Sequence, residues 1–128
     1  VHPGQADQDR RIVNRLAAFD RFCAKLPGSH MVVQWGESHV HKIGPKVFAI
    51  GGGFPGEDGY VFKASPLAFQ LLREQGLASR APYLRRGTWL RVEGGVLSDA
   101  ALFEHIAESH RLVAASLTRA QRAELGLG

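Results

Sequence analysis

Residues 31–64 read MVVQWGESHVHKIGPKVFAIGGGFPGEDGYVFKA, and four runs within this stretch predict short β-strands. The runs are residues 31–35, 39–43, 46–50 and 60–64, each rich in β-branched or aromatic side chains. Glycine and proline mark turns between them, the longest being the glycine-rich loop at residues 51–59. Strands that are joined by such short turns predict an antiparallel meander.

Alternation along each strand predicts which side chains share a face of the sheet. The sets that we expect to lie together are Met31, Val33 and Trp35 on the first strand, Phe48 and Ile50 on the third, and Tyr60 and Phe62 on the fourth.

Helical patterns flank this meander. We expect a first helix that starts near Asp7 or Asp9 and runs to Leu26, before Pro27-Gly28. Its apolar stripe, at steps of three and four, consists of Ile12, Leu16, Phe19, Cys23 and Leu26. Ser65-Pro66 predicts a helix start and Gly76 its end, whereas Ser98 begins a long helix and Thr118 has capping-box spacing to Gln121.

One further strand is expected at residues 88–93, between the helix that starts at Ser65-Pro66 and the helix that starts at Ser98. The order of elements predicts a single α+β domain over residues 1–128, with its core at about residues 10–125. We expect an antiparallel β-sheet of about five strands flanked by N- and C-terminal helices.

Composition limits the class of protein. The only cysteine, Cys23, lies on the apolar stripe, so we expect a buried structural thiol and no disulfide within the chain. No apolar run approaches the roughly 20 residues of a membrane span, and the first residues lack a signal-peptide core. We therefore expect a cytoplasmic protein without membrane contact, and favour a monomer.

Positive charge is concentrated in the middle of the chain. Residues 37–91 carry eight basic and four acidic side chains, whereas residues 92–128 carry three and five. This asymmetry indicates either an anionic partner for the middle segment or ordinary variation of surface charge.

Motifs for catalysis are not found in the sequence. The run Gly51 to Gly56 lacks the Gly-Lys-Ser/Thr ending of a phosphate loop, and no serine lies in a nucleophile elbow. His39 and His41 share a strand face and could seed a zinc site with Glu37 or His30, although an exposed strand-end pair is commoner. We therefore expect a protein that is not an enzyme and that binds no cofactor.

Residues 81–93 read APYLRRGTWLRVE and combine basic with aromatic side chains. If Leu90 and Val92 face the helices, Trp89 and Arg91 project from the other side. Cations that neutralise phosphates beside an aromatic ring suit nucleic acid. The partner that we expect is double-stranded DNA. The candidate nucleic-acid-binding residues are Lys42, Lys63, Arg85, Arg86, Trp89 and Arg91.

Two alternatives remain open for this segment. In one, Trp89 belongs to the core or forms a lid, with Arg91 stacked on its ring. In the other, Tyr83, Trp89 and the glycine-rich loop line a pocket of a protein- or small-ligand-binding module.

Five short motifs in order resemble the MmcQ/YjbR family. They are residues 23–28 (CAKLPG), Trp35-Gly36, residues 41–49 (HKIGPKVFA), residues 62–66 (FKASP) and residues 81–89 (APYLRRGTW). The resemblance implies a CyaY-like (frataxin-like) fold and a DNA-binding protein with a "double wing" surface. It places Lys63, Tyr83 and Trp89 on characteristic family positions. The acidic ridge with which frataxin-like proteins bind iron is not matched, because the first helix also carries four arginines.

Overall fold

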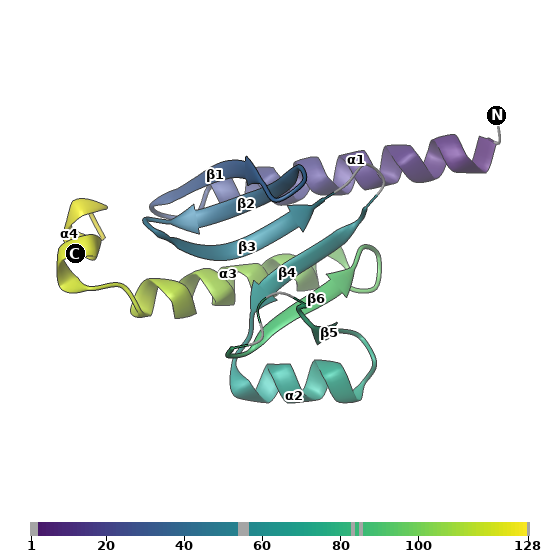
Figure 1. Cartoon of the computed structure of the whole chain (residues 1–128). Helices are drawn as coiled ribbons and strands as arrows, with labels where there is room; N and C mark the ends of the chain where they lie inside the picture. Colours follow the sequence, from purple (N-terminus) through teal and green to yellow (C-terminus); the bar gives the residue numbers. More distant parts are fainter. Residues whose placement is uncertain (1–2, 54–56, 83, 85, 128) are drawn as a thin grey trace.

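The structure, a computed structural model, describes residues 3–53, 57–82, 84 and 86–127, with the side chains of residues 3–9 excepted. Its elements, in chain order, are α1 (Pro3–Ala24), β1 (Ser29–Gln34), β2 (Ser38–Ile43), β3 (Lys46–Gly52), β4 (Gly59–Lys63), α2 (Pro66–Glu74), β5 (Ser79–Arg80), β6 (Trp89–Glu93), α3 (Asp99–Ala115) and α4 (Arg119–Glu124). The predicted α+β class, with helices at both ends of the chain, is confirmed (Figure 1).

The strands form one sheet in the order β1-β2-β3-β4-β6-β5, and every neighbouring pair is antiparallel. The sheet has six strands where about five were expected. The additional strand, β5, has only two residues and pairs with β6. Two residues show no alternation of side chains, so no sequence pattern indicates this strand.

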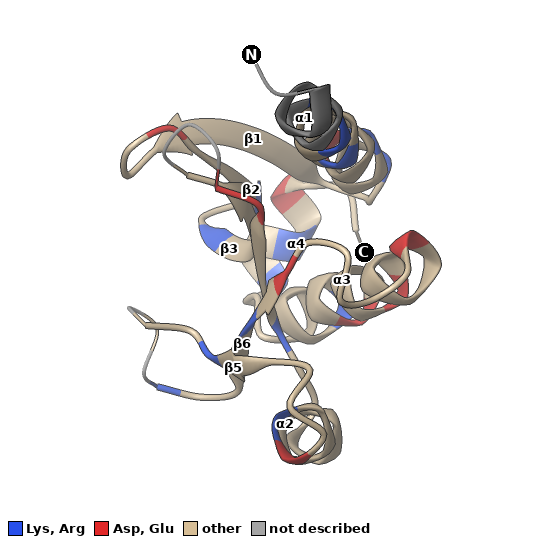
Figure 2. Ribbon diagram, turned by 90° about the vertical axis from the view of Figure 1, so that its right-hand side faces the viewer, with Lys and Arg blue, Asp and Glu red and all other residues tan. Residues whose placement is uncertain are grey.

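Both long helices cover the same face of the sheet, which we call the inner face. α1 contacts β1 to β3 and α3 contacts β2 to β4, and Figure 2 shows the two helices together on one side. Phe62 and Leu90 point into this layer and are fully buried, with Phe19 of α1 and Ile106 of α3. The opposite face of the sheet, which no helix covers in Figure 2, is the outer face.

A β-bulge in β3 corrects one expected set of neighbours. His41 pairs with Ala49 but Lys42 pairs with Val47, which leaves Phe48 as the extra residue. Phe48 is therefore turned to the inner face, where its ring contacts those of His41 and His110. Ile50 pairs with Val61 and lies on the outer face, so Phe48 and Ile50 do not lie together.

Two other expectations about the meander were wrong. β1 ends at Gln34, so Trp35 lies in the turn and not beside Met31 and Val33. Gly51 belongs to β3 rather than to a flexible loop. Residue 51 is a glycine because the Phe19 ring occupies the space that a side chain would need there. The remainder of the expected loop includes residues 54–56, which lie outside the described residues.

The predicted helix caps are confirmed. The hydroxyls of Ser65 and Ser98 accept hydrogen bonds from the backbone N–H groups of Ala68 and Ala101. Thr118 forms the full capping box with Gln121. These caps satisfy backbone donors that would otherwise lack partners at the helix starts.

Candidate functional site: the outer face of the sheet

Strand register places one straight row of residues across the outer face. Residues that pair across neighbouring strands share a face. The row runs through Val32, Val40, Ile50, Val61, Arg91 and Ser79, one residue from each strand. It is apolar over the first four strands and becomes basic at β6.

A second row lies two residues further along the strands. Lys42 pairs with His30 and Val47, and Lys63 pairs with Trp89. Successive residues on one face of a strand are about 7 Å apart, so this row runs beside the apolar one. The outer face therefore carries an apolar strip with cations along one side of it.

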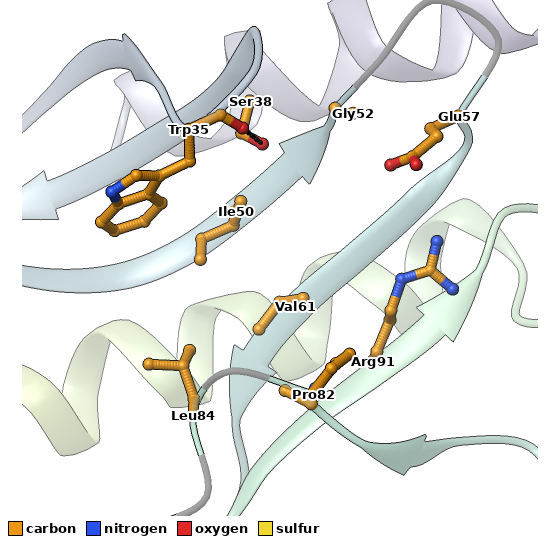
Figure 3. Close-up of a pocket in the computed structure, with 11 residues that line it drawn as sticks. Trp35, Ser38, Ile50, Gly52, Glu57, Val61, Pro82, Leu84 and Arg91 are labelled. Atoms are coloured by element: carbon orange, nitrogen blue, oxygen red, sulfur yellow. Dashed lines mark hydrogen bonds between the residues drawn. The ribbon is translucent and has the colours of Figure 1, made fainter.

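A hollow of about 490 Å³ opens above the apolar row. Ile50 and Val61 form its floor, and Figure 3 shows Trp35 and Leu84 on opposite sides of them. The complete described lining consists of Trp35, Ser38, Ile50, Gly52, Gly53, Glu57, Val61, Ala81, Pro82, Leu84 and Arg91. Its mostly apolar lining with few polar groups is typical of a ligand-binding cleft.

Trp35 is presented to the hollow by an unusual turn. Trp35, Gly36 and Glu37 all have positive φ angles, of 54°, 72° and 74°. Left-handed backbone costs a non-glycine residue of order 1–3 kcal/mol, and such outliers cluster at functional positions. The Ser38 hydroxyl donates to the Trp35 carbonyl at 3.2 Å across the turn, and the indole residue remains 61% exposed.

Arg91 and Glu57 supply the charged groups of the hollow (Figure 3). Arg91 forms an ion pair with Glu93, two residues along β6. The guanidinium lies against Gly59, where a side chain would collide with it. Arg91 is thus held between β4 and the rim of the hollow, and it does not stack on Trp89. The guanidinium–ring contacts found among the described residues are those of Arg73 and Arg80 with Phe69.

The position of Glu57 follows from the anchoring of its neighbour, Asp58. Asp58 pairs with Arg15 of α1 and accepts a hydrogen bond from the Tyr60 hydroxyl at 3.1 Å. Its carbonyl also accepts from the backbone N–H of Gly94 at 2.6 Å. Burial, and then the charge of Asp58, raise the pKa of Tyr60 well above its usual range, so this hydroxyl stays a donor. The two adjacent carboxylates therefore have different surroundings.

Of the predicted nucleic-acid-binding residues, the structure brings Lys42, Lys63, Trp89 and Arg91 to one face. Arg86 is exposed in the connection between β5 and β6. In the described part of the chain, Lys42, Lys63 and Arg86 form no ion pair. Arg85 and Tyr83 lie outside the described residues.

The predicted pocket residue Trp89 is half-buried, packs against the core, and is not among the described residues that line the hollow. Trp35 occupies the corresponding aromatic position instead. Sequence reasoning missed it by extending the first strand one residue too far. The available signal was a large aromatic residue directly before Gly36, the turn glycine.

His39 and His41 lie on the inner face and share the carboxylate of Asp20. His39 donates through Nδ1 at 2.7 Å and His41 through Nε2 at 2.8 Å, because a carboxylate can only accept. His41 is buried, with its ring edge-on to Phe19. Across the residues that the structure describes, no set of three or more His, Cys, Asp or Glu side chains is arranged to hold a metal ion.

Cys23 is fully buried on the inner side of α1, as expected. Burial, and then the charge of Asp20, raise the pKa of its thiol well above its usual range. Its environment is therefore that of a core side chain. Within the described ranges, no helix is both long enough and apolar enough to cross a membrane.

Comparisons with known proteins place the chain in a family. The crystal structure of the Deinococcus radiodurans protein DR2400, which has a DUF419 domain, matches with a TM-score of 0.74 and 23% sequence identity. The match covers 88% of each chain. No curated protein matches the chain. The family model described as YjbR matches residues 24–112, which include all the strands of the sheet. The chain therefore belongs to the YjbR family.

Proposed function

We propose that the outer face binds DNA through its phosphates, without reading the base sequence and without catalysing a reaction. The observation that carries this proposal is the strand register, which directs Lys42, Lys63 and Trp89 from the same face. Lysines neutralise phosphates and release counterions, and an adjacent aromatic ring adds a stacking surface.

The distribution of acidic groups refines which cations contact phosphate. Arg91 is already paired with Glu93, so its charge is partly neutralised. Lys42 and Lys63 have no such partner among the described residues. We therefore assign the phosphate contacts to Lys42 and Lys63, and to Arg86 in the connection between β5 and β6, and expect Arg91 to contribute less.

The absence of base reading follows from the shape of the surface. A broad sheet face has no helix that could enter the major groove, which is how sequence-specific motifs usually gain access to base edges. Affinity should then depend strongly on salt and weakly on base sequence.

A titration of a short fluorescent duplex between about 50 and 200 mM salt tests the proposal. The double variant Lys42→Ala/Lys63→Ala should reduce the slope of log affinity against log salt by about 2, one unit for each lost phosphate contact. The matched control is Lys25→Ala/Arg119→Ala, which removes the same charge from two exposed positions after α1 and in α4.

The control variant should retain the slope of the unmodified protein. Equal slopes for both double variants would show that binding depends on net charge alone and not on the outer face.

The hollow favours a second candidate function, the binding of a small flat ligand. Its floor of Ile50 and Val61 and the guanidinium of Arg91 suit a largely apolar body with one polar edge. The two functions are distinguishable, because binding of a neutral small ligand in the hollow would depend little on Lys42 and Lys63.

A further inference from the structure

We propose that the hollow holds one unpaired base of a single-stranded DNA segment, stacked on the indole of Trp35. This inference rests on the proposed function and deepens it, because it names which part of the nucleic acid enters the outer face. It follows from the dimensions of the hollow, the presentation of Trp35, and the polar groups at one end.

The hollow has the size and lining for a planar heterocycle. Its volume of about 490 Å³ lies within the range of small-molecule sites and leaves room for one base with part of its sugar. Ile50 and Val61 offer an apolar floor, and Pro82 and Leu84 form the side opposite Trp35 (Figure 3). A flat ring between these walls would be covered on both faces.

Trp35 has the features of a contact residue rather than of a core residue. An indole that is 61% exposed contributes little to the folding core. It is nevertheless held by three consecutive left-handed residues, a costly backbone arrangement. Stacking on an aromatic side chain is tolerant of base identity, since every base has a π-face.

The charged groups select a neutral body with mixed polarity. Arg91, Glu57 and Glu93 together carry a net charge of one negative unit, so the end of the hollow does not favour an anion. Arg91 can donate hydrogen bonds and Glu57 can accept them. The Watson–Crick edge of a nucleobase presents both acceptors and donors, and it is available only when the base is unpaired.

The cations needed for the connecting phosphates lie outside the hollow. Val61 forms the floor, and Lys63 is the next outer-face residue of the same strand, about 7 Å further along. A strand whose base enters the hollow can therefore place its backbone along the row of Lys42 and Lys63. The same geometry predicts weaker binding of a duplex, whose bases are stacked and paired.

The test compares a short labelled single strand, the duplex of the same sequence and a free mononucleotide, at fixed low salt. The unmodified protein should bind the single strand most tightly. Trp35→Ala should weaken single-strand binding by about five- to a hundredfold, as expected for loss of one stacked base, and duplex binding by less than about twofold. Trp35→Phe should restore most of the loss, because it keeps a π-face.

Glu57→Gln should leave single-strand affinity within about threefold, since an amide still offers an acceptor, whereas Glu57→Leu should weaken it further. The fluorescence of Trp35, measured alone in a Trp89→Phe background, should be quenched by the single strand.

Three outcomes separate the possibilities. Unchanged single-strand affinity in Trp35→Ala, with salt-dependent duplex binding intact, would overturn the base site and leave the proposed function standing. Mononucleotide binding as tight as that of the strand would overturn the strand as occupant. Failure of all nucleic acids to bind would overturn both this inference and the proposed function.

Discussion

Lys63 of β4 and Trp89 of β6 lie directly opposite each other, so both side chains leave the sheet on the outer face. Their inner neighbours, Phe62 and Leu90, also pair with each other and are fully buried. One step along two adjacent strands thus separates the core from the candidate binding surface. The two tryptophans of the chain have different roles, since Trp89 packs against the core and Trp35 lines the hollow.

Replacing each tryptophan by alanine should distinguish the structural role of Trp89 from the surface role of Trp35. Trp89→Ala should lower the free energy of unfolding by about 1–3 kcal/mol, because a half-buried indole loses its core contacts. Trp35→Ala should change it by no more than about 0.5 kcal/mol, as is usual for an exposed side chain. Urea unfolding monitored by circular dichroism measures both. A larger loss in Trp35→Ala than in Trp89→Ala would contradict this division.

The hydroxyl of Ser109 on α3 joins two strands of the sheet. It accepts from the backbone N–H of Lys63 at 2.8 Å and donates to the Phe48 carbonyl at 2.6 Å. Ser109→Ala leaves both backbone groups without this partner and should cost about 1–3 kcal/mol in urea unfolding.

The control for this variant is Ser79→Ala, at an exposed position of β5, which should stay within about 0.5 kcal/mol of the unmodified protein. If Ser109→Ala were as stable as Ser79→Ala, the bridge between α3 and the two strands would not stabilise the fold.

The surroundings of the Asp20 carboxylate make the free energy of unfolding depend on pH. Burial raises its pKa, but the hydrogen bonds from His41 and His39 and the charges of both rings outweigh this, so the pKa lies below its usual value. A lowered pKa in the folded state stabilises the protein above the unfolded pKa of about 4, and this contribution is lost as the pH falls through the folded value.

Acid titrations of stability should therefore differ between variants. Below about pH 4, the free energy of unfolding should fall more steeply in the unmodified protein than in Asp20→Asn. Parallel curves for the two proteins would show that Asp20 is not held by the histidines.

Gly51 is required by the close approach of α1 to the sheet. A β-carbon at this position would lie 2.5 Å from an atom of the Phe19 ring. Gly51→Ala must displace that ring and should cost about 1–3 kcal/mol, as overpacking does in well-filled cores. Thermal unfolding measures the loss, and an unchanged melting temperature would show that Phe19 can move without cost.

Local sequence signals predicted most of the elements. The caps at Ser65, Ser98 and Thr118 depend on backbone N–H groups only three residues away, and the meander depends on turns within the same stretch. The positions of Lys63 and Arg91 on the outer face followed from alternation alone, since β4 and β6 pair without a bulge. These features could be predicted because their causes lie within a few residues of sequence.

The hollow could not be predicted, because its walls come from separate turns. Trp35 is turned out by left-handed backbone, and Ile50 reaches the outer face only because Phe48 is an extra residue in β3. Glu57 is placed by the anchoring of Asp58 to Arg15, a residue more than forty positions away. Alternation within a single strand contains none of this information.

The most direct test of the outer face uses the two indole N–H groups as reporters. The chain has only two tryptophans, Trp35 and Trp89, and both lie on this face. Titration of ¹⁵N-labelled protein with short DNA should shift both indole signals in a saturable, salt-dependent manner, with the larger change at Trp35 for a single strand. Saturable binding with both indole signals unmoved, and amide changes confined to α1 and α3, would contradict the account.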